Sequence, residues 1–309
     1  MIPVNSVLQV GQFPEIMQRE IQLRLATTVL LDPQGRVPEG NFMAILTRSN
    51  TTLPESLFEQ LPNVRMVATC GVGYDNLPLP LLKKRGIKAS NTPGVLNDAV
   101  CELAIGMLFG LLRRIPQAHA FVKSAAWSQA PFAITTTLAG KRIGIAGMGR
   151  IGQDLAKRLE SFKVEIAYTG PSQKNIPYKY FPDILSLAKA SDILVLACPA
   201  NPDTERMINA AVLDALGPEG YLINIARGSV VNEADLLVAL QQKKIAGAAL
   251  DVFENEPNPN ADFLNIDNVL LTPHIGSATS ETRQLMTNLA IDNLEAFYNQ
   301  QPLLTEVKN

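Results

Sequence analysis

Short runs of apolar residues alternate with amphipathic helical segments through most of the chain. This alternation is typical of parallel β-sheets built from βαβ units. The pattern occurs in two sets. The expected strands of the first set are SVLQV, FMAILT, VRMVAT and IKAS, and those of the second are RIGIAG, VEIAY, DILVLAC, YLINIA, GAALDVF and NVLLTP. We therefore predict an α/β protein with two doubly wound parallel-sheet domains.

Two helical segments indicate how the domains are joined. Apolar residues of LNDAVCELAIGMLFGLLRRI, between the two sets of strands, recur at helical spacing and predict a long connecting helix. Near the C-terminus, the Ser- and Thr-rich stretch around Glu281 is typical of a helix start, and one apolar stripe follows it at Met286, Ala290, Leu294 and Phe297. We expect this last helix to return to the first domain. The predicted division is 1–96 plus 279–309 for the first domain and 97–278 for a second domain inserted in it.

Composition excludes several classes of protein. The chain has 309 residues, is 47% hydrophobic and has a formal net charge of -2, without the basic excess of a nucleic-acid-binding protein. Its longest apolar helical run, Leu103 to Leu112, is far shorter than the roughly 20 residues of a membrane span. The N-terminus has no secretory signal pattern. We therefore expect a cytoplasmic protein that binds neither nucleic acid nor membrane.

The three cysteines, Cys70, Cys101 and Cys198, have no paired spacing. An odd number of cysteines without such spacing argues against both a disulfide framework and a zinc site. We expect buried, reduced thiols and no metal centre.

The stretch GKRIGIAGMGRIGQDLAKRL, residues 140–159, contains Gly147, Gly149 and Gly152 in the order G-x-G-x-x-G. An apolar strand precedes the glycines and an amphipathic helix follows them, as a dinucleotide-binding loop requires. The first glycine allows a tight turn, the second lets a pyrophosphate approach the backbone, and the third lets helix and strand pack closely. Amides at the helix start then bind the phosphates. This placement predicts a dinucleotide site.

The end of the next strand differs from the usual NAD pattern. An acid that binds the adenosine ribose is expected about 20 residues after the glycines, but the chain reads VEIAYTGPSQK there. No carboxylate is present to accept from a 2′-hydroxyl or repel a 2′-phosphate. We therefore expect NADP(H) to be preferred, with NAD(H) as the alternative. The candidate phosphate contacts are Thr169, Ser172 and Lys174, which could also form an ordinary polar loop.

Three later segments each carry one ionisable residue where a strand ends or a loop begins: Arg227 in INIARGSVV, Glu256 in LDVFENEP and His274 in TPHIGSAT. Strand carboxyl ends gather over the ligand crevice of a doubly wound sheet, so the three side chains could meet. A guanidinium suits a carboxylate or carbonyl oxygen, and a carboxylate beside a histidine favours the protonated ring. Such a set suits carbonyl reduction. Taken one by one, the residues could instead be a buried structural arginine, a solvated glutamate and a capping histidine.

Together these motifs resemble the D-isomer-specific 2-hydroxyacid dehydrogenases. The resemblance covers nearly the whole chain, through CGVGYDN, NTPGVLNDAVCELA, GMGRIG, CPANPDT, INIARGSVVNEADL, ALDVFENEP and LLTPHIGSAT. It is strongest with the glyoxylate, hydroxypyruvate and hydroxyphenylpyruvate reductase branch, on SDILVLACPANPDT, DALGPEGYLINIARG and NLEAFYNQQPLLT.

The resemblance implies that the chain reduces a small 2-keto acid to a D-2-hydroxy acid. Arg227, Glu256 and His274 would be the catalytic residues, with His274 as the general acid. The first domain would be the substrate-binding domain and the inserted one the NAD(P)-binding Rossmann domain, through which two copies would form a homodimer. The substrate would contact Val72, Gly73, Arg227 and His274. The implied cofactor-binding residues are Gly147, Gly149, Arg150, Ile151, Gly152, Thr169, Ser172, Lys174, Cys198, Pro199, Thr204, Ile225, Ala226, Asp251, at the nicotinamide carboxamide, and Gly276.

Several points stay open. NADPH-using members of the branch often carry an arginine where this chain has Gly170 and Pro171. Formate dehydrogenases share this architecture but resemble a pattern that has Gln at the position of Glu256. Glu256 therefore favours a hydroxy acid. A phosphoglycerate-type dehydrogenase and a non-catalytic, dinucleotide-sensing corepressor are alternatives, although such proteins carry an added domain or tails, whereas this chain ends at LLTEVKN. The natural substrate is also open, because the pocket depends on side chains such as Leu53, Trp127 and Phe132.

Overall fold

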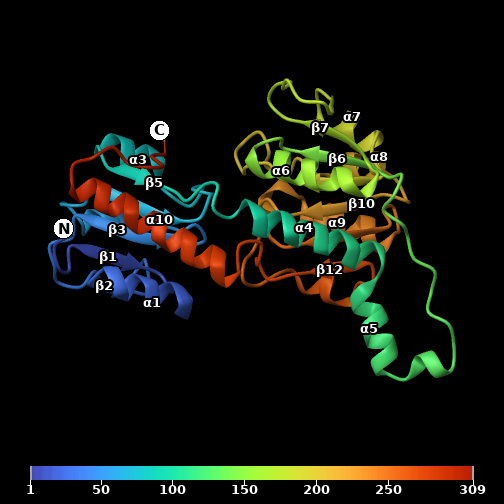
Figure 1. Cartoon of the computed structure of the whole chain (residues 1–309), viewed down its shortest axis with the longest axis horizontal. Helices are drawn as coiled ribbons and strands as arrows, with labels where there is room; N and C mark the ends of the chain where they lie inside the picture. The colour runs from blue at the N-terminus through green and yellow to red at the C-terminus, as the bar shows by residue number, and fades with distance from the viewer. Residues whose placement is uncertain (1, 308–309) are drawn as a thin grey trace. The chain divides into compact units, whose positions relative to one another are not determined.

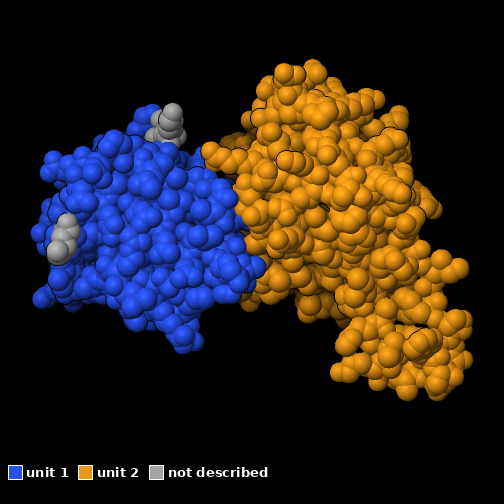
Figure 2. Space-filling view, viewed as in Figure 1, with its two compact units in different colours: residues 1–96, 277–309 blue, residues 97–276 orange. Residues whose placement is uncertain are grey.

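The chain forms two compact α/β units in the computed structural model, which describes residues 2–307 (Figures 1 and 2). Unit 1 comprises residues 1–96 and 277–309, and unit 2 comprises residues 97–276. The chain therefore leaves unit 1, builds all of unit 2, and returns for its last helix. The return falls after residue 276, close to the 278 predicted from the sequence.

Unit 1 contains a five-stranded, all-parallel sheet in the order β2-β1-β3-β4-β5. Its central strands β1, β3 and β4 are buried almost throughout, which explains why they are continuous apolar runs. The short edge strand β2 was not among the predicted strands. The strands are β1 (Val7–Val10), β2 (Thr27–Leu30), β3 (Ala44–Arg48), β4 (Met66–Cys70) and β5 (Lys88–Ser90).

Helices cover this sheet. Leu57 and Phe58 of α2 (Glu55–Glu59) and Leu82 of α3 (Leu79–Lys84) pack in one hydrophobic cluster with Ile45 and Val67 of the sheet. The C-terminal helix α10 (Ser280–Tyr298) packs against β4 and against α1 (Glu15–Arg24). The side chain of Thr279 caps α10 by accepting from the backbone N–H of Thr282, as the Ser/Thr-rich start predicted.

Unit 2 contains a seven-stranded, all-parallel sheet in the order β12-β11-β10-β9-β6-β7-β8. Starting from β6, the chain moves outward through β7 and β8, then returns to β9 and moves outward on the other side. This is the Rossmann order with one further strand, and ligands of such sheets bind at the strand carboxyl ends where the order reverses. The strands are β6 (Arg142–Ala146), β7 (Glu165–Thr169), β8 (Lys179–Tyr180), β9 (Ile193–Leu196), β10 (Tyr221–Asn224), β11 (Gly247–Leu250) and β12 (Val269–Leu271).

The predicted connecting helix is confirmed as α4 (Asn97–Leu112), which packs against α6 (Arg150–Leu159) and the sheet. The other α-helices of unit 2 are α7 (Ile184–Lys189), α8 (Ala210–Leu216) and α9 (Glu233–Gln241), in addition to α5 described below. All three cysteines are buried and unpaired, as predicted. Within residues 2–307, no helix combines the length and apolarity that crossing a bilayer demands.

One segment of unit 2 was not predicted. After α4, helix α5 (Ile115–Lys123), the short 3-10 helix η1 (Ala126–Ser128) and the coil that follows project away from the rest of unit 2 (Figure 1). Phe121 and Phe132 stack edge to face and hold the segment together. We call residues 113–137 the arm. Its exposed apolar side chains are Ile115, Val122, Trp127 and Ile134.

Candidate active site

The glycine loop follows β6 directly and has the geometry that the motif predicts. Gly147 adopts a left-handed φ of 99°, and a Cβ there would lie 2.6 Å from the backbone of Cys198. A Cβ on Gly152 would lie 2.1 Å from the carbonyl oxygen of Gly147. Both positions therefore require glycine, the first for the turn beside β9 and the second for close packing of α6 on the loop.

Gly149 ends the loop and precedes α6. No side chain of the described residues caps this helix start, and a Cβ on Gly149 would meet no atom within 4 Å. The amides of the first turn, in Arg150, Ile151 and Gly152, thus have no capping side chain as acceptor among the described residues. A helix N-terminus beside a bare glycine backbone suits a pyrophosphate, so these residues fit a dinucleotide.

The loop after β7 is where a 2′-phosphate would be recognised. Thr169 is only 7% exposed, and its carbonyl oxygen accepts from the N–H of Gly147 at 3.0 Å. Ser172 and Lys174 are exposed, and the hydroxyl of Tyr168 accepts from the backbone N–H of Lys174 at 2.7 Å. Of the three predicted contacts, Ser172 and Lys174 therefore have the accessible side chains, on a loop fixed by Tyr168.

The remaining predicted cofactor residues of unit 2 follow the carboxyl ends of its strands. Cys198 and Pro199 follow β9, and the hydroxyl of Thr204 donates to the carbonyl oxygen of Pro199 at 2.8 Å. Ile225 and Ala226 follow β10. Because the sheet is parallel, these segments lie on the same edge as the glycine loop.

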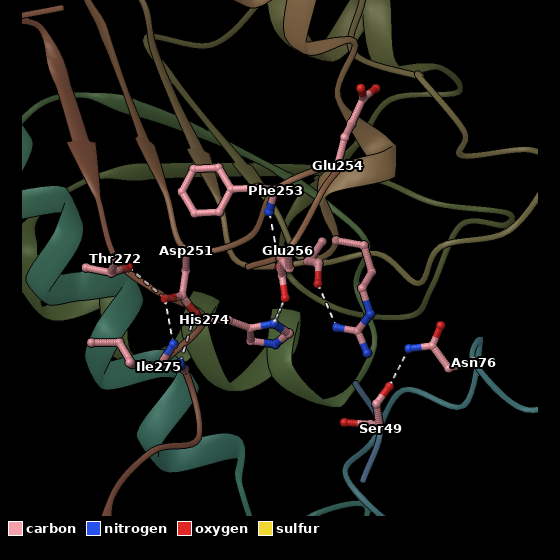
Figure 3. A network of polar contacts seen from close by, with 12 residues as sticks. Ser49, Asn76, Asp251, Phe253, Glu254, Glu256, Thr272, His274 and Ile275 are labelled. Carbon is pink, nitrogen blue, oxygen red and sulfur yellow. Dashed lines mark hydrogen bonds and ion pairs between the residues drawn. The ribbon is translucent and has the colours of Figure 1, made fainter. Parts of the chain in front are cut away.

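Glu256 and His274 are in direct contact (Figure 3). His274 Nδ1 lies 2.6 Å from Glu256 Oε2, and the N–H of Phe253 donates to Glu256 Oε1 at 3.1 Å. Burial disfavours the ionised carboxylate, but the hydrogen bond from His274, the His274 charge, the Phe253 N–H and the charge of Arg227 together hold the Glu256 pKa below its usual value. A carboxylate on Nδ1 leaves Nε2 to face a substrate.

Arg227 follows β10 and begins the 3-10 helix η3 (Gly228–Val230). The side chain of Asn224 donates to the Arg227 carbonyl oxygen at 3.0 Å, which fixes the backbone at this point. Gly228 lies so close to the next loop that a Cβ there would be 1.9 Å from the Phe253 carbonyl carbon. The loops after β10 and β11 are thus packed together, and the charges of both Arg227 and His274 act on Glu256.

Asp251 has a structural task that the sequence did not reveal. It is 2% exposed, and its carboxylate accepts from the Thr272 hydroxyl at 2.7 Å, the Ile275 N–H at 2.8 Å and the Gly276 N–H at 2.9 Å (Figure 3). The Asp251 carbonyl oxygen also accepts from the N–H of His274, whose φ of 51° is left-handed. Burial raises the Asp251 pKa despite these donors and the His274 charge. Asp251 therefore anchors the His274 loop.

A second buried acid, Glu233, was missed altogether. Its carboxylate accepts from the backbone N–H of Glu254 at 2.7 Å, and burial raises its pKa above the usual value. Glu233 is the first residue of α9, and acids are common there because the helix dipole favours a negative charge at the helix N-terminus. Because its place at a helix start already explains this acid, the sequence does not indicate that Glu233 contacts the loop that carries Glu256.

The predicted substrate residues Val72 and Gly73 lie in unit 1, immediately after β4. The Asn91 side chain donates to the Val72 carbonyl oxygen at 2.8 Å and fixes this loop. Leu53, considered as a pocket side chain, is 2% exposed and belongs to the unit 1 core. Trp127 is exposed on the arm. Residues 2–307 contain no group of three or more His, Cys, Asp or Glu side chains that could hold a metal ion.

Comparison with known proteins gives a consistent result. Residues 105–276 match the model of the D-isomer specific 2-hydroxyacid dehydrogenase NAD-binding domain. The chain is 40% identical over 308 residues to glyoxylate/hydroxypyruvate reductase A HPR2 of Arabidopsis thaliana, covering 99% of this chain and 97% of that protein. It is 44% identical over 265 residues to hydroxyphenylpyruvate reductase of Plectranthus scutellarioides, covering 85% of each.

A solved structure is similar over almost the whole chain. It is the NADPH-dependent glyoxylate/hydroxypyruvate reductase of Sinorhizobium meliloti in complex with NADP and malonate. The TM-score is 0.93 at 37% sequence identity, with 98% of this chain and 97% of that chain covered.

Proposed function

Because the chain belongs to the D-isomer-specific 2-hydroxyacid dehydrogenase family, we propose that it reduces a small 2-keto acid to the D-2-hydroxy acid with NADPH as its preferred cofactor. The observation that carries this proposal is the contact of 2.6 Å between Glu256 and His274, beside Arg227 and on the same sheet edge as the glycine loop. The named relatives support glyoxylate and hydroxypyruvate as substrates.

Each residue of the trio has a distinct part. The reduced nicotinamide, when bound, supplies the hydride that reduces the carbonyl carbon. His274 donates the Nε2 proton to the carbonyl oxygen, so the 2-keto group becomes a hydroxyl. Glu256 holds the ring by Nδ1 and stabilises its protonated form. Arg227 binds the carboxylate and carbonyl side of the substrate with its planar guanidinium. Val72 and Gly73 would contribute backbone contacts to the substrate.

The preference for NADPH rests on the loop after β7. No carboxylate there would repel a 2′-phosphate, and Ser172 and Lys174 offer a hydroxyl and an ammonium. A flexible lysine binds phosphate less rigidly than an arginine, so we expect a modest preference. The similar enzyme of Sinorhizobium meliloti is NADPH-dependent, which supports the assignment.

Two further properties belong to the proposal. The arm carries a fully exposed Ile134 and a largely exposed Trp127, side chains that a second copy of the chain could cover in a homodimer. A monomeric mass in light scattering would contradict this. A cytoplasmic location remains a prediction from the sequence.

The test is NADPH oxidation by the purified chain with a panel of glyoxylate, hydroxypyruvate, arylpyruvates and phosphohydroxypyruvate. We expect turnover with at least one unphosphorylated acid. The His274→Asn variant should bind NADPH normally and lose about 10²- to 10⁴-fold in kcat. Preference for the phosphorylated acid would favour a phosphoglycerate-type enzyme. NADPH binding without turnover on any substrate would favour a dinucleotide sensor.

A further inference from the structure

Two arginines meet at the carboxyl edge of the unit 1 sheet. Arg48 is the last residue of β3 and pairs in register with Cys70, the last residue of β4, so both side chains lie on the same face. Arg283 comes from the first turn of α10, which packs against β4. Burial lowers the pKa of Arg283, and the charge of Arg48 lowers it further. Both arginines therefore come from elements that adjoin β4, and the charge of Arg48 disfavours the charged form of Arg283.

Among the described residues, no carboxylate forms an ion pair with either arginine. Within residues 2–307, neither Arg48 nor Arg283 has an ion-pair partner, and the guanidinium of Arg283 donates no hydrogen bond. Arg48 donates to the Gln12 carbonyl oxygen at 3.1 Å, while its Nε is buried without a partner. By contrast, Arg24 contacts two carboxylates of α10 at 2.7 and 2.8 Å. In unit 1, the partly buried Arg24 thus forms ion pairs with carboxylates, whereas Arg48 and Arg283 form none within the described part of the chain.

This arrangement is unfavourable for the protein alone. A cation in the first turn of a helix opposes the helix dipole, which favours anions there. Two partly buried like charges without a counterion also destabilise the folded state. Costs of this kind often accompany a functional site, and paired guanidiniums are suited to carboxylates and phosphates.

The pair lies beside the loop that we expect to bind the substrate carboxylate. Cys70 is followed directly by Gly71, Val72 and Gly73, and Arg48 by Ser49. The two segments are in close contact, because a Cβ on Gly71 would lie 2.1 Å from the Ser49 hydroxyl. Backbone amides of this loop can donate hydrogen bonds but carry no net charge. A nearby pair of cations would supply the charge that the amides lack.

We propose that Arg48 and Arg283 form a cationic site in unit 1 that attracts and holds the carboxylate of the 2-keto acid at the 71–73 loop. The inference rests on the proposed function and adds a specificity determinant to it, namely selection for small anionic carbonyl compounds. Neither arginine takes part in proton or hydride transfer. Their effect therefore falls on substrate binding.

The decisive variants are Arg48→Gln and Arg283→Gln, with Arg24→Gln as the control for removing a unit 1 arginine. We expect each of the first two to raise the KM for the keto acid about tenfold or more, with little change in kcat or in the KM for NADPH. Their thermal stability should be unchanged or higher, because the repulsion between the two arginines is removed.

Raising the ionic strength should lower kcat/KM less in the variants than in the wild type. Arg283→Lys should restore part of the affinity. Arg24→Gln should lower stability slightly and leave KM unchanged.

A binding measurement separates failure of this inference from failure of the proposed function. Oxalate, a small dicarboxylate, is added to the protein without cofactor, and the unfolding temperature is measured. We expect oxalate to stabilise the wild type and Arg24→Gln, and to have a much smaller effect on Arg48→Gln and Arg283→Gln. Equal stabilisation of all four proteins, no stabilisation of the wild type, or loss of stability with unchanged KM in the arginine variants would overturn the proposal. If no keto acid is reduced but oxalate behaves as expected, only the enzymatic function fails.

Discussion

Replacing Asp251 with Asn tests whether this residue anchors the His274 loop or serves the cofactor. The carboxylate accepts three hydrogen bonds, two at Oδ1 from Thr272 and Ile275 and one at Oδ2 from Gly276. An asparagine can keep its oxygen toward the first two donors. Its amide nitrogen then faces the Gly276 N–H, and two donors oppose each other in a buried place.

The expected loss of stability follows from the number of hydrogen bonds that the substitution disrupts. One buried N–H without an acceptor costs about 1–3 kcal/mol. Loss of the carboxylate charge weakens the two remaining hydrogen bonds, while removal of a buried charge offsets part of that loss. We therefore expect a net destabilisation of about 1–3 kcal/mol. For a domain of this size, such a change lowers the unfolding temperature by about 2–10 °C. Displacement of His274 by about 1 Å should lower kcat by about 10²-fold.

The measurements are thermal unfolding, steady-state kinetics and NADPH affinity by fluorescence titration. Asp214→Asn is the matched control, because Asp214 is an exposed partner of Lys244 in the same unit and should change none of the three. The anchoring role predicts a lower unfolding temperature and kcat, with NADPH affinity changed less than tenfold. If NADPH affinity collapses while stability is unchanged, Asp251 serves the nicotinamide and the reasoning is refuted.

Three further substitutions test the proposed roles. Glu256→Gln should move the loss of reduction at high pH to lower pH, because a neutral amide stabilises the protonated His274 ring less than a carboxylate does; an unchanged pH profile would show that the two are not coupled. Arg227→Lys should raise the keto-acid KM and leave NADPH affinity nearly intact, whereas the reverse would assign Arg227 to the cofactor. Gly170→Asp has room for its Cβ and should shift the kcat/KM preference toward NADH; a wild type that already favours NADH would contradict the expected cofactor choice.

The sheets and the candidate trio could be read from the sequence for one physical reason. Strands buried on both faces are continuous apolar runs, and a parallel sheet brings the residues after each strand to one edge. Arg227 and Glu256 follow β10 and β11, and His274 follows β12, so their proximity is a consequence of topology. The glycine loop could also be predicted from the sequence, because the close contacts that require glycine at 147 and 152 lie within the strand–loop–helix motif and its neighbouring strand.

Other features depend on contacts that no local pattern encodes. Glu233 has a sufficient explanation as a helix-start acid, so its bond to Glu254 is visible only in the fold. Arg48 and Arg283 are far apart in the sequence, and only the fold lets the charge of Arg48 act on Arg283. Leu53 lies among polar residues in TRSNTTLPES, so no local pattern indicates its burial in the unit 1 core.

Three acids, Glu233, Asp251 and Glu256, lie on or against the two loops that carry Glu256 and His274, and their surroundings affect their pKa values differently. Burial raises the pKa of Glu233 and of Asp251, and each accepts from backbone N–H groups that it holds in place. Only the pKa of Glu256 is lowered, because it receives the His274 ring and lies near the charge of Arg227. Of the three acids, Glu256 is therefore the one whose ionised form its surroundings favour. The two other acids hold the backbone of these loops without a side-chain bond to the ring, so Asp251→Asn tests the position of the loop, whereas Glu256→Gln tests the contact with the ring itself.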